Sequence, residues 1–153
     1  MPKPLRGICG LTRASGRTGG GRGVPTPPGG DSGDLQATAL REFFEETGSS
    51  ETPIFIGKLS EVYIPVSKFI VQPYVAYLTK RPDFFINDVE VYKLIEWELH
   101  ELLAQQTTNT TIITASNIDI VTPYFMVDEK ILWGATAMII NELKHVIKDS
   151  VNL

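Results

Sequence analysis

Cysteine and histidine are scarce in this chain of 153 residues. Cys9 is the single cysteine, which excludes an internal disulfide and is typical of a reducing compartment, so a cytoplasmic location is expected. His100 and His145 are the only histidines, and a zinc site built from histidine and cysteine is therefore not expected. No apolar run reaches the length of a membrane span, and no signal segment opens the chain, so we expect no membrane association.

The composition otherwise predicts one globular domain preceded by an unusual segment. Residues 1–33 hold ten of the thirteen glycines and five of the ten prolines, without apolar periodicity, and we predict an atypical or disordered segment there. Residues 34–153 are predicted to form the folded domain. The five basic residues and one acid of the first segment give it a charge of +4; because the whole chain carries −4, the domain carries −8. An acidic domain argues against a general nucleic-acid surface.

Two other interpretations of residues 1–33 stay open. The run Gly19-Gly20-Gly21-Arg22-Gly23 resembles a single copy of an Arg-Gly-rich RNA-binding tail. Alternatively, the abrupt change of composition near residue 33 is what a shifted reading frame would produce.

The most informative motif is Arg41-Glu42-Phe43-Phe44-Glu45-Glu46-Thr47-Gly48. Its three glutamates have i, i+3, i+4 spacing, which places neighbouring carboxylates on one face of a helix predicted from Leu35 to Thr47. Gly48 can end that helix in the left-handed conformation, and Ser32 or Asp34 can cap its start. The opposite arc is apolar and consists of Ala37, Leu40, Phe43 and Phe44.

Crowded carboxylates repel one another unless a cation neutralises them. The simplest cation is Mg²⁺ or Mn²⁺, since both ions prefer oxygen ligands. The alternative is a solvated acidic face without a ligand.

The order of residues resembles the second half of the Nudix box, G-x5-E-x7-R-E-U-x-E-E-x-G-U, where U is a bulky apolar residue. Within the Nudix hydrolases the chain is most similar to coenzyme A pyrophosphatases, and three stretches carry this narrower resemblance: residues 34–42; residues 63–75 with 87–91; and residues 131–137. The resemblance implies an α/β/α sandwich with a mixed sheet, from which the N-terminal strands are missing or replaced.

The resemblance also implies roles for individual residues. Glu42, Glu45 and Glu46 would be the metal ligands. Glu46 is the first choice for general base and Glu90 the second; a solvated acid at a strand end is the alternative for Glu90. Arg41 would pair with carboxylates and hold the helix.

Substrate contacts are expected from Gly29, Gly30, Ser67 and Tyr74, and Tyr63 could join them. Ordinary strand packing is the alternative for Tyr63, Ser67 and Tyr74. Trp97 and Trp133 are expected in the core rather than as base-stacking platforms.

The chain departs from the box at its start. The Nudix box has glutamate where this chain has Gly33, and glycine where this chain has Pro27. Gly29-Gly30 resembles the Gly-Gly pair of the family, but it lies three or four residues closer to Arg41 than the family pattern requires. Ser49 replaces the final bulky apolar residue, which is a milder change.

Further elements are predicted from local pattern. Strands are expected over residues 52–58, 68–79 (with Pro73 marking an edge or bulge), 89–97, 107–114, 120–127 and 131–133; a turn over 128–130; and helices over 98–105 and from 135 onward. The order of these elements predicts an α/β fold.

The expected function is metal-dependent hydrolysis of a diphosphate linked to a nucleoside, with coenzyme A cleaved to 3′,5′-ADP and 4′-phosphopantetheine. Two alternatives remain: another Nudix substrate, such as a nucleotide sugar, dinucleotide or nucleoside triphosphate, or a catalytically impaired binding module. The expected partner is a nucleotide-type small molecule, and a homodimer is left open.

Overall fold

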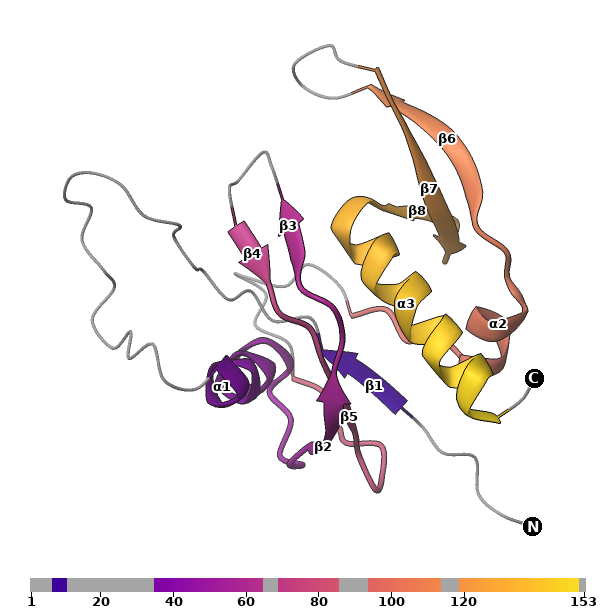
Figure 1. Cartoon of the computed structure of the whole chain (residues 1–153). Helices are drawn as coiled ribbons and strands as arrows, with labels where there is room; N and C mark the ends of the chain where they lie inside the picture. Colours follow the sequence, from indigo (N-terminus) through magenta and orange to yellow (C-terminus); the bar gives the residue numbers. More distant parts are fainter. Residues whose placement is uncertain (1–6, 11–34, 65–68, 86–93, 114–118, 152–153) are drawn as a thin grey trace, which may run out of the picture.

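The computed structural model describes residues 7–10, 35–64, 69–85, 94–113 and 119–151. Three helices are separated by runs of strands along these residues, which confirms a chain that combines α and β structure (Figure 1). In chain order the elements are β1 (Gly7–Gly10), α1 (Leu35–Thr47), β2 (Ile54–Lys58), β3 (Val62–Ile64), β4 (Phe69–Val71), β5 (Tyr74–Tyr77), α2 (Leu99–Ala104), β6 (Thr108–Ile113), β7 (Asp119–Val127), β8 (Lys130–Trp133) and α3 (Gly134–Val151).

The described strands form three small sheets, with strand orders β1-β5-β2, β3-β4 and β6-β7-β8. All of their pairings are antiparallel, so the mixed sheet expected from the sequence is not found among the described residues. Several neighbouring strands, such as β7 and β8, are joined by short connections, which can link only antiparallel strands.

A strand within the first 33 residues was not predicted. Gly7–Gly10 forms β1 and pairs antiparallel with β5, from Gly7 opposite Tyr77 to Gly10 opposite Tyr74. The expectation that no strand precedes α1 is therefore wrong for these four residues. The capping candidates Ser32 and Asp34 lie outside the described residues, as does most of the first segment.

Pro73 separates two strands, β4 and β5, instead of marking an edge or bulge in one strand. Its side chain is fully buried, and its carbonyl accepts hydrogen bonds from Leu59 N (3.1 Å) and from Gln72 Nε2 (3.2 Å). Because proline has no N–H to donate, the ladder stops here, and the chain passes from the β3-β4 hairpin to the centre of the first sheet.

The long helix α3 lies between the β3-β4 hairpin and the sheet β6-β7-β8 (Figure 1). It contributes residues to two apolar clusters. Ile139 and Leu143 of α3 pack against the β3-β4 hairpin, and Ala137 packs against α2 and β7. The first cluster contains Leu59, Val62, Val71, Ile139 and Leu143; the second contains Leu102, Phe125, Val127 and Ala137. Each fully buried apolar side chain contributes about 1.5–3 kcal/mol, so α3 organises much of the core.

One charged residue lies beside the second cluster. Lys144 is 6% exposed, donates a hydrogen bond to the backbone oxygen of Gln105, and stands 5.7 Å from the Phe125 ring centroid. The amide of Gln105 bonds both the N–H and the carbonyl of Met126, at 3.1 and 3.0 Å. Lys144 and Gln105 thus connect α3, the end of α2 and β7.

The two tryptophans differ in environment. Trp97 is half-buried and packs edge-to-face on Phe125, with ring centroids 5.6 Å apart, so its assignment to the core is confirmed. Trp133 is 42% exposed, and the core assignment is wrong for it. It lies opposite Tyr124 in the β7-β8 ladder, on the face opposite to the buried Phe125.

The remaining strand and helix predictions are largely confirmed. The turn expected over 128–130 is the two-residue connection Asp128-Glu129, and the short helix over 98–105 is α2. The strand expected over 89–97 is not found in its described part, residues 94–97; residues 89–93 lie outside the described ranges. None of the described helices combines the length and apolar character needed to cross a membrane.

Candidate functional site

Helix α1 carries the candidate site, and its bounds agree with the sequence prediction, Leu35 to Thr47. Ala39 and Phe43 are buried, and Leu40 and Phe44 are half-buried, so the predicted apolar arc faces the protein. Ala37 is exposed, contrary to its assignment to that arc, because it lies at the margin, about 60° around the helix from Leu40 and about 120° from Phe43.

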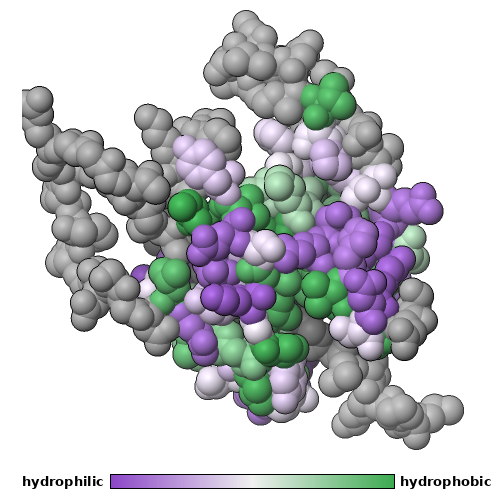
Figure 2. Space-filling model, viewed as in Figure 1, coloured by the Kyte–Doolittle hydropathy of each residue, from purple (hydrophilic) through white to green (hydrophobic). Residues whose placement is uncertain are grey.

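The three glutamates of α1 differ in exposure. Glu42 is half-buried, while Glu45 and Glu46 are exposed. In the space-filling view, hydrophilic residues gather over α1 and over α3, with hydrophobic residues between and below them (Figure 2). The structure therefore presents these carboxylates on an accessible surface.

Arg41 bonds to the carboxylate of Glu45 within this face. Arg41 Nη1 donates to Glu45 Oε2 over 2.6 Å, and the two side chains are 59% and 53% exposed. This hydrogen bond, together with the charge of Glu45, raises the pKa of the Arg41 guanidinium. An exposed pair of this kind contributes little to stability, because water competes for both partners.

The C-terminal end of α1 is fixed by a close backbone contact. Gly48 has φ +60° and donates from its N–H to Phe44 O over 2.9 Å, while Phe85 N donates to Thr47 O over 2.9 Å. A Cβ at Gly48 would overlap the carbonyl oxygen of Phe85 and lie 2.9 Å from its carbonyl carbon. Only glycine satisfies both the positive φ and this approach.

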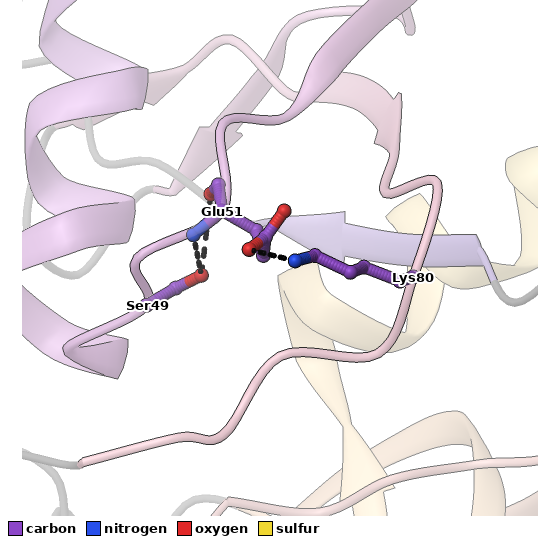
Figure 3. Close-up of polar contacts among 3 residues, drawn as sticks. All are labelled: Ser49, Glu51 and Lys80. Atoms are coloured by element: carbon purple, nitrogen blue, oxygen red, sulfur yellow. Dashed lines mark hydrogen bonds and ion pairs between the residues drawn. The ribbon is translucent and has the colours of Figure 1, made fainter.

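The residues after Gly48 add a second attachment (Figure 3). Ser49 Oγ accepts from Glu51 N at 3.0 Å and donates to Glu51 O at 3.2 Å, and Glu51 Oε1 pairs with Lys80 Nζ at 2.9 Å. Ser49 is 7% exposed. A small hydroxyl side chain bonded to the local backbone thus occupies the buried place where the Nudix pattern has a bulky apolar residue.

The donor chemistry of α1 fits a hard divalent ion, since carboxylate oxygens are the ligands that Mg²⁺ and Mn²⁺ prefer. Within the described ranges, however, no three Asp, Glu, His or Cys side chains gather into a group that could hold a metal ion. The glutamates supply suitable donors along one helix face, and the metal assignment stays a prediction.

The other predicted site residues are only partly described. Glu90, Ser67, Gly29 and Gly30 lie outside the described residues. Tyr74 is half-buried on β5 and lines a hollow beside α1, and Tyr63 is 57% exposed on β3. The structure therefore places Arg41 and the three glutamates on one helix and pairs Arg41 with Glu45, but it does not gather the three carboxylates into one group; Tyr74 lies on the neighbouring sheet.

Sequence reasoning missed the residues that support α1 from a distance, chiefly Phe85 and Lys80. Their signal is weak, because both lie in a segment without periodic pattern, more than 30 positions after the helix. The dipeptide Gly48-Ser49 was the available sign that something packs closely on the end of the helix.

The sequence is 31% identical over 125 residues to proteins described as uncharacterized Nudix hydrolase NudL. These relatives come from Yersinia pestis (strain Pestoides F) and Yersinia pseudotuberculosis serotype O:1b (strain IP 31758), and the matched region is 78% of this chain. The chain spans 62% of the length of each relative. No protein-family model matches the sequence, and no solved structure matches it.

Proposed function

Because this chain belongs to the Nudix hydrolase superfamily, we propose that it hydrolyses the phosphoanhydride bond of a diphosphate linked to a nucleoside. The single observation that carries the proposal is the exposed face of α1, on which Glu42, Glu45 and Glu46 follow Arg41 in the order of the Nudix box. The similarity to Nudix hydrolases supports the reaction class, and the residues of α1 support the site.

Glu42, Glu45 and Glu46 would hold Mg²⁺ or Mn²⁺. Such an ion, when bound, neutralises charge on the diphosphate and lowers the pKa of a water molecule. Glu46 is the proposed general base, since an exposed carboxylate next to the ligands can accept a proton from the attacking water; Glu90 is the second choice.

Arg41 is proposed to act through the helix. Its bond to Glu45 orients that carboxylate, and its guanidinium offsets part of the repulsion among the three glutamates. The Ser49 and Phe85 contacts hold the end of the same helix, so that Glu45 and Glu46 keep a fixed place relative to the sheet.

Coenzyme A is the proposed substrate, with 3′,5′-ADP and 4′-phosphopantetheine as products. This choice rests on the resemblance of three stretches to coenzyme A pyrophosphatases: residues 34–42; residues 63–69 and 71–75 with 87–91; and residues 131–137. A nucleotide sugar, dinucleotide or nucleoside triphosphate is the second candidate, and an impaired binding module is the third, favoured by Gly33 at the place of the first box glutamate.

Other parts of the proposal concern the whole protein. We propose an α/β/α sandwich over residues 34–153 and a cytoplasmic location. The boundary at residue 33 stays a prediction, and Gly7–Gly10, which lies before it, contributes β1 to the first sheet. Homodimerisation is a prediction that sedimentation would test.

The test is a turnover assay with coenzyme A and ADP-ribose, each with Mg²⁺ and with Mn²⁺. We expect 3′,5′-ADP release from coenzyme A, and loss of at least about a hundredfold in rate in Glu46→Gln and Glu45→Gln, with unfolding midpoints close to wild type. Glu101→Gln, an exposed acid on α2, is the matched control and should keep full rate. Full activity in Glu46→Gln would refute its role; absence of turnover with both substrates, together with absence of Mn²⁺ binding, would favour the impaired module.

A further inference from the structure

A hollow of about 370 Å³ lies between the first turn of α1 and the sheet β1-β5-β2. Its size falls in the lower part of the range of small-molecule sites, about 300–1,000 Å³. Residues from α1, β2 and β5 line it: Gln36, Phe55, Ile56, Gly57, Lys58 and Tyr74.

The floor of the hollow is made by an aromatic pair and a distorted strand. The Phe55 and Tyr74 rings meet edge-to-face, with centroids 5.8 Å apart and an interplanar angle of 78°. Pairing of β2 with β5 shifts between Phe55 and Gly57, so Ile56 is extruded from the ladder and is 68% exposed. Such a bulge re-aims side chains and opens the strand locally.

Gly57 keeps the hollow open. A Cβ placed on Gly57 would meet no atom within 4 Å, and Gly57 does not have a positive φ. The glycine is thus not required by backbone conformation or by a close neighbour. Its lack of a side chain leaves room for a ligand to approach the backbone.

The charge of the hollow is positive. Lys58 is exposed and is the one charged residue of the lining, and among the described residues no hydrogen bond or ion pair of its side chain is found. Gln36 adds an amide with donor and acceptor groups, and Tyr74 adds a hydroxyl. Aromatic surface, an amide edge and an ammonium group together suit a nucleobase that carries a phosphorylated sugar.

The hollow lies within reach of the acidic face of the same helix. Gln36 precedes Glu42 by six residues, which is about 9 Å along the helix axis and about 120° around it. The ligand must therefore be longer than a nucleoside: its base can occupy the hollow while a diphosphate attached to the ribose passes around the helix toward Glu42.

We propose that this hollow is the subsite for the nucleoside half of the substrate: the Phe55–Tyr74 pair receives the base, and Lys58 binds a phosphate on the ribose. This inference rests on the proposed function, since it identifies the substrate as a nucleotide with a phosphate in addition to its diphosphate. ADP-ribose lacks that phosphate, and coenzyme A carries it.

The experiment separates binding from turnover. Calorimetric titrations with 3′,5′-ADP and with 5′-AMP are run in excess EDTA on wild type, Gly57→Leu, Lys58→Met and the control Lys130→Met, which lies on β8. We expect Gly57→Leu to weaken both nucleotides at least about tenfold by filling the hollow. Lys58→Met should weaken 3′,5′-ADP about tenfold and 5′-AMP less, because it removes a charge-assisted hydrogen bond. Lys130→Met should bind as wild type does.

Two binding results contradict the subsite. Wild-type affinity in both Gly57→Leu and Lys58→Met overturns it, as does absence of nucleotide binding by wild type. Circular dichroism checks that Gly57→Leu is folded, and Lys58→Met, at an exposed side chain, tests the proposal independently. If the variants lose nucleotide binding while wild type hydrolyses neither substrate, the subsite stands and the proposed function fails. If wild type turns over coenzyme A and both variants keep its KM, the proposed function stands and the subsite fails.

Discussion

Replacing Gly48 by alanine should destabilise the protein more than the same change at any other described glycine of the domain. Two separate penalties act at Gly48. Its φ of +60° is costly for an L-residue, about 1–2 kcal/mol. A Cβ would also overlap the Phe85 carbonyl, so the backbone must move and weaken the hydrogen bond from Phe85 N to Thr47 O, worth about 0.5–1.5 kcal/mol. Together these effects predict a loss of about 2–3 kcal/mol.

Two other glycines separate the penalties. Gly134 has φ +66° but open space around a Cβ, so Gly134→Ala should lose only the conformational part, about 1–2 kcal/mol. Gly57 has neither feature, and Gly57→Ala should stay within about 0.5 kcal/mol of wild type or gain slightly. Phe85→Ala should also have a small effect, because the contact is made by the backbone and the ring is 74% exposed.

Urea unfolding of the four variants measures these differences, provided that the m values agree with wild type. If Gly48→Ala were no less stable than Gly134→Ala, the close approach of Phe85 to the end of α1 would be refuted, whatever the absolute values. If Gly134→Ala matched Gly57→Ala, the conformational argument itself would fail.

Two further predictions concern the hairpin and the buried lysine. Asp128 and Glu129 connect β7 and β8 with φ of 49° and 61°, and a turn of this kind prefers glycine at its second position. Glu129→Gly should therefore raise the free energy of unfolding by about 1 kcal/mol, whereas the control Lys130→Gly, in the strand, should lower it. A Glu129→Gly variant less stable than wild type in urea unfolding would contradict the turn geometry. Burial lowers the pKa of Lys144, and the charge of Lys148 is the second cause. At pH values just below 10.5, the ordinary pKa of lysine, the unfolded chain therefore binds more protons at this residue than the folded chain does. The free energy of unfolding increases as the pH rises through this range. Lys144→Met should remove this increase, which a series of urea titrations across the alkaline range would detect; equal pH slopes in the two proteins would count against the burial of a charged Lys144.

The local sequence pattern predicts elements whose stabilising interactions lie close together in the sequence. It does not predict elements that form only by contact with distant residues. Helix α1 was predicted to its ends because its apolar period, its length and Gly48 are all encoded within fourteen residues. Strand β1 was missed because Gly-Ile-Cys-Gly has no alternation of its own and becomes a strand only by pairing with β5, more than 60 positions later. Pro73 was assigned to an edge because the sequence does not reveal that its two flanks belong to different sheets.

The candidate site divides in the same way. The glutamates fall on one face of α1 by helical spacing alone, so their common location was predictable. The contacts from Phe85 and Lys80, and the hollow formed where the β2 bulge meets Tyr74, depend on tertiary packing and could not be read from the motif.

The two sides of α1 carry different physical tasks, and this bears on how substitutions there should be interpreted. The helix is attached through buried Ala39 and Phe43, through the backbone at Gly48 and through Ser49, none of which involves a glutamate of the motif. The Arg41–Glu45 bond is exposed, so its loss removes little stability and Glu45 can exchange it for another cation. Replacing Glu45 or Glu46 by glutamine should therefore leave the fold in place, and a loss of turnover in those variants can be assigned to the missing carboxylate rather than to unfolding. A large fall in the free energy of unfolding of Glu46→Gln would instead show that the acidic face contributes to folding. A loss of turnover in that variant could then no longer be assigned to the missing carboxylate.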